Sequence, residues 1–135
     1  MNTYTEILRN PSFVRLAAIL RRLHTPGWRS RHRGVPANAL IDAMRTALDP
    51  DAFTRAGVLD TITMALYAVA DTDQSGALRP TTEDIAWLVH ILDGEPDRAL
   101  AVLWLLLAYS SAPDENVTPE EAAALTGMAA STWRS

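Results

Sequence analysis

The 135-residue chain has no cysteine, no lysine and few aromatic side chains (7%). The absence of cysteine excludes disulfide bonds, thiolate zinc sites and a cysteine nucleophile. The longest apolar run, residues 99–109, falls well short of the roughly 20 residues of a membrane span and predicts a buried helix. Residues 1–9 lack the apolar stretch of a signal peptide, and Asn2 excludes myristoylation. We therefore expect a cytoplasmic protein that does not associate with membranes.

The positive charge is concentrated at the N-terminal end. All 12 basic residues are Arg, against 16 acidic residues, and the formal net charge is −4. Residues 1–34 hold seven Arg and one acid, a charge of +6, whereas residues 35–135 hold five Arg and fifteen acids, a charge of −10. The length fits one domain, and 48% hydrophobic residues is too many for a disordered chain.

Apolar residues recur with a helical period along almost the whole chain, and no segment shows sustained strand alternation. Asn10 is expected to cap a helix that begins at Pro11, while the Pro- and Gly-containing residues 25–36 predict a loop. Further helices are expected over 37–48, around 58–69, from Thr81 or Thr82 to Gly94, and over 96–109. The positions expected to face the core are Phe13, Leu16, Ala17, Leu20, Leu23, Leu40, Ile41, Met44, Leu48, Val58, Leu59, Ile62, Ala65, Leu66, Val69, Ile85, Leu88, Val89 and Leu92.

The predicted fold class is therefore all-α: a single compact bundle of six to seven short helices. Residues 1–116 form the helical body, with its basic N-terminal helix and loop, and residues 117–135 form a C-terminal unit. The most apolar helix, over 96–109, is expected to lie at the centre of the bundle or in an oligomer interface.

The C-terminal unit, VTPEEAAALTGMAASTWRS, has the layout of a helix-turn-helix. Thr118 to Glu121 fits a capping box with Pro119 at the first helical position, and Gly127 can adopt the positive φ needed between two helices. The unit resembles the helix-turn-helix of excisionases and MerR-type regulators, and also the last region of sigma factors. The matched residues are Thr118, Glu121, Ala122, Ala123, Leu125, Gly127, Met128, Thr132 and Arg134.

This resemblance implies that four residues of the second helix face DNA. They are Ala130, Ser131, Thr132 and Arg134. The match stops about seven residues into that helix, which is the pattern of a truncated motif. The alternative is a short helix pair that closes the core with Trp133 packed inside.

A second candidate site is the basic segment near the N-terminus. Arginine forks match phosphate oxygens, and the interleaved Trp28 is expected to stack on an unpaired base. Alternatively, the segment contacts an acidic protein surface, or it is a solvated loop paired with local acids. The arginines of this candidate nucleic-acid site are Arg21, Arg22, Arg29, Arg31 and Arg33.

Residues 71–78 resemble the first part of an EF-hand calcium loop, with oxygen ligands at Asp71, Asp73, Ser75 and the Ala77 carbonyl. Position 12, however, is threonine, and the acid expected there comes one place late, at Glu83. The pattern favours an ordinary polar turn over a calcium site.

Signatures of catalysis are absent from the sequence: there is no P-loop, dinucleotide glycine pattern, HExxH or Gly-x-Ser-x-Gly. His90 is expected to be half-buried and hydrogen-bonded. We expect a non-enzymatic, cofactor-free protein that binds DNA and regulates transcription. The alternative is a helical protein-interaction module, such as a phage or bacterial adaptor, with a protein partner or a second copy; the third is an EF-hand-like calcium binder.

Overall fold

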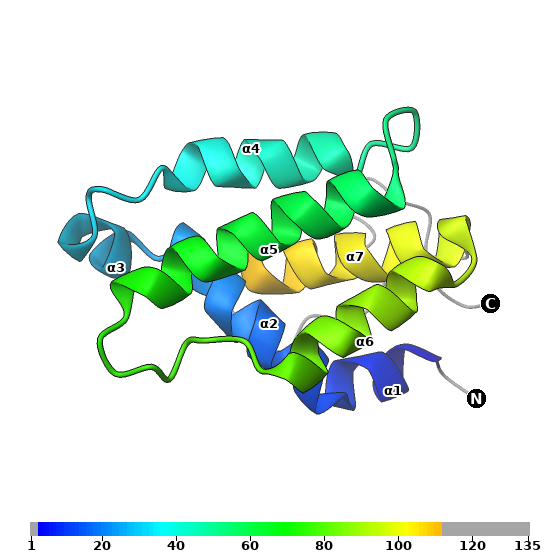
Figure 1. Cartoon of the computed structure of the whole chain (residues 1–135), viewed down its shortest axis with the longest axis horizontal. Coiled ribbons are helices and arrows are strands. Elements are labelled where there is room, and N and C mark those ends of the chain that lie inside the picture. Colours follow the sequence, from blue (N-terminus) through cyan, green and yellow to red (C-terminus); the bar gives the residue numbers. More distant parts are fainter. Residues whose placement is uncertain (1–2, 112–135) are drawn as a thin grey trace.

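A computed structural model describes residues 3–111, which form seven α-helices, one 3₁₀ turn and no strand (Figure 1). The all-α prediction is confirmed. The predicted unit 117–135, including Ala130, Ser131, Thr132 and Arg134, lies outside the described residues. The elements are α1 (Thr3–Arg9), α2 (Pro11–Arg21), η1 (Arg22–His24), α3 (Pro26–Arg31), α4 (Ala37–Ala47), α5 (Arg55–Thr72), α6 (Thr82–Asp93) and α7 (Pro96–Ser111).

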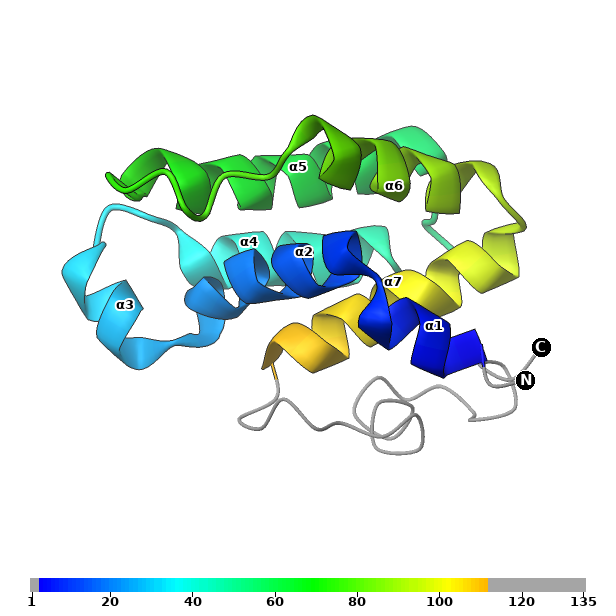
Figure 2. The same cartoon turned by 90° about the horizontal axis from the view of Figure 1, so that it is seen from below.

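The helices form two layers. Helices α5 and α6 lie side by side in one layer, and α2, α4 and α7 lie beneath them (Figure 2). The short helix α3 lies at one end of the long axis, and the turn between α6 and α7 lies at the other end (Figures 1 and 2). Helix α2 contacts α5, α6 and α7 and is therefore the element on which the others converge.

Within residues 3–111, the N-caps predicted for two helices are observed. The Asn10 side chain accepts hydrogen bonds from the backbone N–H groups of Ser12 (2.9 Å) and Phe13 (3.3 Å), and Pro11 is the first residue of α2. Thr81, one of two predicted caps for α6, forms a capping box with Asp84. These side chains satisfy backbone donors that have no partner within the helix.

The core contains most of the predicted residues. Phe13, Leu16 and Leu20 of α2 are fully buried. Helix α7 is buried along most of its length, as its apolar sequence predicts. Its Trp104 donates a hydrogen bond from the indole Nε1 to the Leu48 carbonyl, at 2.9 Å, and so ties α7 to the end of α4.

Several local predictions were wrong. Val89, expected to face the core, is 36% exposed. Leu59 and Ile85 are half-buried but pack against the core, as predicted. Residues 3–9, for which no helix was predicted, form α1. His90, expected to be half-buried, is exposed.

No helix within residues 3–111 is both long and apolar enough to span a bilayer.

Candidate nucleic-acid interface

The predicted loop over residues 25–36 contains the short helix α3. Thr25 is extended, and Pro26 occupies the first helical position, where its missing N–H is not needed. Trp28 anchors the helix because its side chain, 4% exposed, packs into the hydrophobic core. The loop prediction was wrong because it weighed Pro and Gly content above this apolar anchor.

Anchored in this way, α3 and the turn that follows it present three arginines at one end of the molecule. Arg31 and Arg33 are exposed, and the half-buried Arg29 donates a hydrogen bond to Asn38 Oδ1 at 2.7 Å. Among residues 3–111, no carboxylate lies within ion-pairing distance of these three side chains. We call Arg29, Ser30, Arg31 and Arg33 the α3 basic surface.

The α3 basic surface is hollowed. Arg29 and Arg33 line a shallow, open depression of about 430 Å³ together with Pro26, Ser30 and Val35. Two arginines and a serine thus line the depression together with the apolar Pro26 and Val35. This arrangement suits an anionic group, since guanidinium and hydroxyl groups both donate to phosphate oxygens.

The other two predicted arginines lie against the body of the protein. Arg21 donates a hydrogen bond to the Tyr109 carbonyl at 2.9 Å, and its guanidinium carbon lies 5.7 Å from the centroid of the Tyr109 ring. Arg22 is half-buried, and its Nε forms no hydrogen bond within the described part of the chain. The five predicted arginines therefore form two groups. Three lie on the α3 basic surface, and two lie where α2 ends and η1 begins.

Arg45 of α4 is a basic residue of this region that sequence reasoning missed. The half-buried His24 has a pKa below its ordinary value, chiefly because burial disfavours the charged imidazolium and further because of the positive charges of Arg45 and Arg29. The charges of Arg45 and Arg29 thus both act on His24. No local signal in the sequence could show this, because only the packing of α4 against η1 brings Arg45 there.

The burial of His24 makes stability depend on pH. Its Nε2 has no hydrogen-bond partner within residues 3–111. Because its folded pKa lies below the unfolded value of about 6.5, the unfolded chain binds the proton more readily. The stability contributed by neutral His24 is complete above that value and is lost as the pH falls below it.

We therefore expect the free energy of unfolding to decrease from pH 7.5 to pH 5, and to decrease less in a His24→Gln variant. Urea denaturation at the two pH values measures both slopes. His90→Gln, which replaces an exposed histidine of α6, is the matched control and should retain the wild-type slope. An unchanged slope in His24→Gln contradicts the assignment.

The structure changes the expected role of Trp28. Its buried ring is not accessible to a base. Instead it stacks on His32, with ring centroids 4.3 Å apart and planes 20° from parallel. The His32 Nδ1 lies 2.9 Å from the Trp28 carbonyl oxygen, so a second contact fixes the imidazole on the indole.

In the acidic loop after α5, backbone and side-chain groups of the loop itself donate to the carboxylates. Asp73 accepts hydrogen bonds from the Leu78 N–H (3.0 Å) and the Ser75 hydroxyl (2.9 Å), and these bonds lower the pKa of its carboxyl. Asp71 forms an ion pair with Arg79 at 3.0 Å. Ala77, whose backbone carbonyl was a candidate ligand, and Glu83 are both exposed. Residues 3–111 hold no group of three or more acidic, histidine or cysteine side chains arranged for a metal ion.

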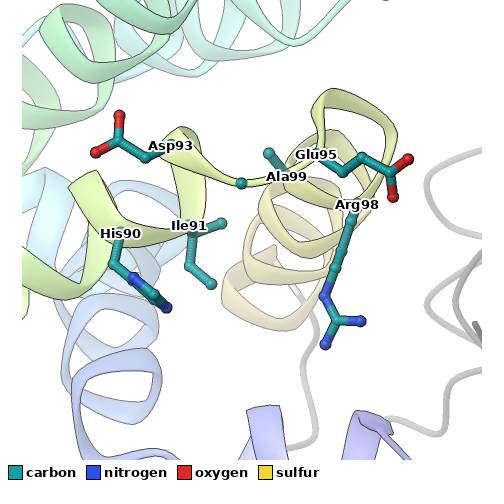
Figure 3. A pocket seen from close by; sticks show the side chains of 7 residues that line it. His90, Ile91, Asp93, Glu95, Arg98 and Ala99 are labelled. Carbon is teal, nitrogen blue, oxygen red and sulfur yellow. The ribbon is translucent and has the colours of Figure 1, made fainter.

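A second depression, of about 310 Å³, lies at the turn between α6 and α7 (Figure 3). His90 and Arg98 extend to one side of it, whereas Asp93 and Glu95 point in other directions. General acid–base catalysis requires titratable groups that converge on a common point, and these four side chains do not.

One further ionic contact was not anticipated. Arg15 of α2 donates to the fully buried Asp84 of α6 through Nε (3.0 and 3.1 Å to the two carboxylate oxygens) and through its terminal nitrogen (2.8 Å). Burial raises the pKa of the Asp84 carboxyl, but hydrogen bonds from Arg15, the Thr81 N–H and Ser12 outweigh it and keep the pKa below its ordinary value. The contact joins two helices, so its role is structural.

Comparison with protein-family models, curated proteins and solved structures finds no match. Function must therefore be inferred from the charges and geometry of the chain. Among the sites described above, the α3 basic surface alone has two arginines and no acidic side chain in the lining of its depression, whereas Asp93 and Glu95 line the depression between α6 and α7.

Proposed function

We propose that this protein binds nucleic acid through the α3 basic surface and acts as a regulatory protein. The observation that carries the proposal is the pair Arg29 and Arg33, which borders a concave surface with no carboxylate partner in the described chain. A guanidinium group matches phosphate bidentately, and a row of such groups binds the backbone of a polyanion.

The surrounding charge supports the proposal. Residues 7–41 contain seven Arg and no acidic residue, so the local sequence supplies no competing anion. Arg45 adds a further cation from α4. Because contacts to phosphate carry no base information, this surface explains affinity but not sequence preference.

We propose that the C-terminal unit recognises DNA bases, and this proposal rests only on its resemblance to known helix-turn-helix segments. The residues concerned are Ala130, Ser131, Thr132 and Arg134, all outside the described range. A Thr132→Ala, Arg134→Ala variant should lose discrimination between DNA sequences in a selection from random oligonucleotides, while non-specific affinity changes little.

Replacement of Arg29, Arg31 and Arg33 with alanine is expected to weaken binding to mixed-sequence DNA by at least about tenfold at low salt. The dependence of the logarithm of affinity on the logarithm of salt concentration should become shallower by about 3, since each lost phosphate contact removes about one unit of slope. Fluorescence anisotropy with labelled DNA across a salt series measures both quantities.

The matched control replaces three other exposed arginines, Arg9, Arg55 and Arg98, and changes the net charge by the same amount. It should retain most of the affinity and slope. Equal losses in the two triple variants would show that net charge alone drives binding. Failure of the wild-type protein to bind DNA at low salt would contradict the proposal.

A protein-interaction module is the second candidate function. Met64, 60% exposed, and Tyr67, 37% exposed, lie one turn apart on α5, and exposed apolar side chains of this size are common where partners bind. If this function holds, wild-type protein self-associates or binds a protein partner in light-scattering experiments without nucleic acid, and Met64→Glu abolishes the association.

A further inference from the structure

We infer that His32 is the side chain on which an unpaired base stacks, and that the α3 basic surface therefore favours single-stranded over double-stranded nucleic acid. This inference rests on the proposed function. It assigns to His32 the stacking role that was expected for Trp28, whose ring is buried.

The geometry of the pair carries the inference. Trp28 covers one face of the His32 imidazole at a centroid distance of 4.3 Å, while His32 itself is only half-buried. Within the described residues no other ring contact involves His32. A base that stacks on the outer face would extend the Trp28–His32 stack by one ring.

The Trp28–His32 stack is already formed in the protein without a ligand. His32 forms the C-cap of α3, and its ring Nδ1 lies 2.9 Å from the Trp28 carbonyl oxygen. If the ring is neutral, this contact places the proton on Nδ1 and leaves Nε2 as an acceptor. Because both rings are already fixed, little side-chain entropy is lost when a base binds.

The charges beside His32 suit the phosphates of a strand whose base is stacked. Arg31 and Arg33 are its neighbours in the chain, and both are exposed. In a duplex the bases are stacked on each other and inaccessible from the side, so His32 would gain no stacking contact. In a single strand a base is free to turn onto the ring, and such stacking depends little on base identity.

Three ligands test the inference by fluorescence anisotropy at fixed low salt: a labelled 20-nucleotide oligothymidylate, a labelled 20-base-pair duplex, and a labelled single strand in which abasic sites replace the central bases. His32→Ala should weaken oligothymidylate binding by about tenfold, as expected for one lost base–aromatic stack. Its affinity for the duplex and for the abasic strand should change less than about twofold. His32→Phe, which keeps a flat ring, should restore most of the oligothymidylate affinity.

Thermal unfolding of both variants checks that α3 remains folded. If His32→Ala binds oligothymidylate like wild type, or if it weakens all three ligands equally, the stacking inference is overturned. In either case the Arg29, Arg31 and Arg33 variant still decides the proposed function separately, because that variant should lose affinity for all three ligands. A wild-type protein that binds none of them overturns both.

Discussion

Replacement of Phe13 with alanine is expected to lower the free energy of unfolding by about 3–5 kcal/mol, the range typical of large-to-small substitutions at fully buried aromatic sites. Phe13 has no exposed surface. Its ring makes edge-to-face contacts with Trp87 of α6, at 6.2 Å between centroids, and with Tyr109 of α7, at 5.7 Å. The substitution therefore removes apolar burial and two aromatic contacts, and it leaves a cavity where three helices meet.

Urea denaturation followed by circular dichroism measures this loss. Val14→Ala is the control at the neighbouring position, because Val14 is 47% exposed, and it should change stability by no more than about 0.5 kcal/mol. A Phe13→Ala loss below about 1 kcal/mol would mean that α2 does not pack against α6 and α7 as described.

Replacement of Asp84 with alanine is expected to lower the free energy of unfolding by about 2–4 kcal/mol. The substitution removes the acceptor of Arg15 and of the Thr81 N–H, and with it half of the capping box of α6. The expected loss lies below the upper range for buried ion pairs because the Arg15 side chain is 45% exposed, and water can hydrate it once the carboxylate is gone.

The neighbouring acid supplies a close control. Glu83 is also in the first turn of α6 but is exposed, so both acids interact similarly with the helix dipole. Glu83→Ala should cost about 0.5 kcal/mol or less. Similar losses in the two variants would show that the Arg15 contact contributes no stability.

The Asp84 contact also has a pH signature. Because hydrogen bonds hold the folded pKa of Asp84 below its ordinary value, the ionised carboxylate stabilises the folded protein fully above the unfolded pKa of about 4. That stability is lost as the pH falls through the folded pKa. Wild-type protein should therefore lose more stability between pH 5 and pH 3 than Asp84→Asn, which cannot titrate at this position.

Local patterns predicted the helices well, because a helix is determined by neighbours three and four residues apart. The caps at Asn10 and Thr81 and the buried stripe of α2 needed no more than that. Helix α3 was missed because its Pro and Gly indicated a loop, whereas the burial of Trp28 depends on the rest of the fold.

The contacts that define the sites were harder to predict. Arg15 and Asp84 are 69 residues apart in sequence, and each alone is unremarkable in an amphipathic helix. Thr81 was predicted as a cap, but neither its capping-box partner Asp84 nor the contact of Asp84 with Arg15 was. Arg45 joins the basic region only through the packing of α4 against η1. Such pairings depend on which faces meet, which the period of a single helix does not specify.

The positions of α3 and of the turn between α6 and α7 affect how the protein approaches a charged ligand. The turn carries Asp93, Glu95 and Asp97 and lies at the opposite end of the long axis from the arginines of α3 (Figure 1). These two regions thus form a pair of opposite charges, a local dipole, along the long axis of the described helices. In the field of a polyanion, such a dipole experiences a torque that turns the α3 end toward the ligand before contact. Since screening shortens the field to about 10 Å at 0.1 M salt, this orientation should speed association mainly at low ionic strength.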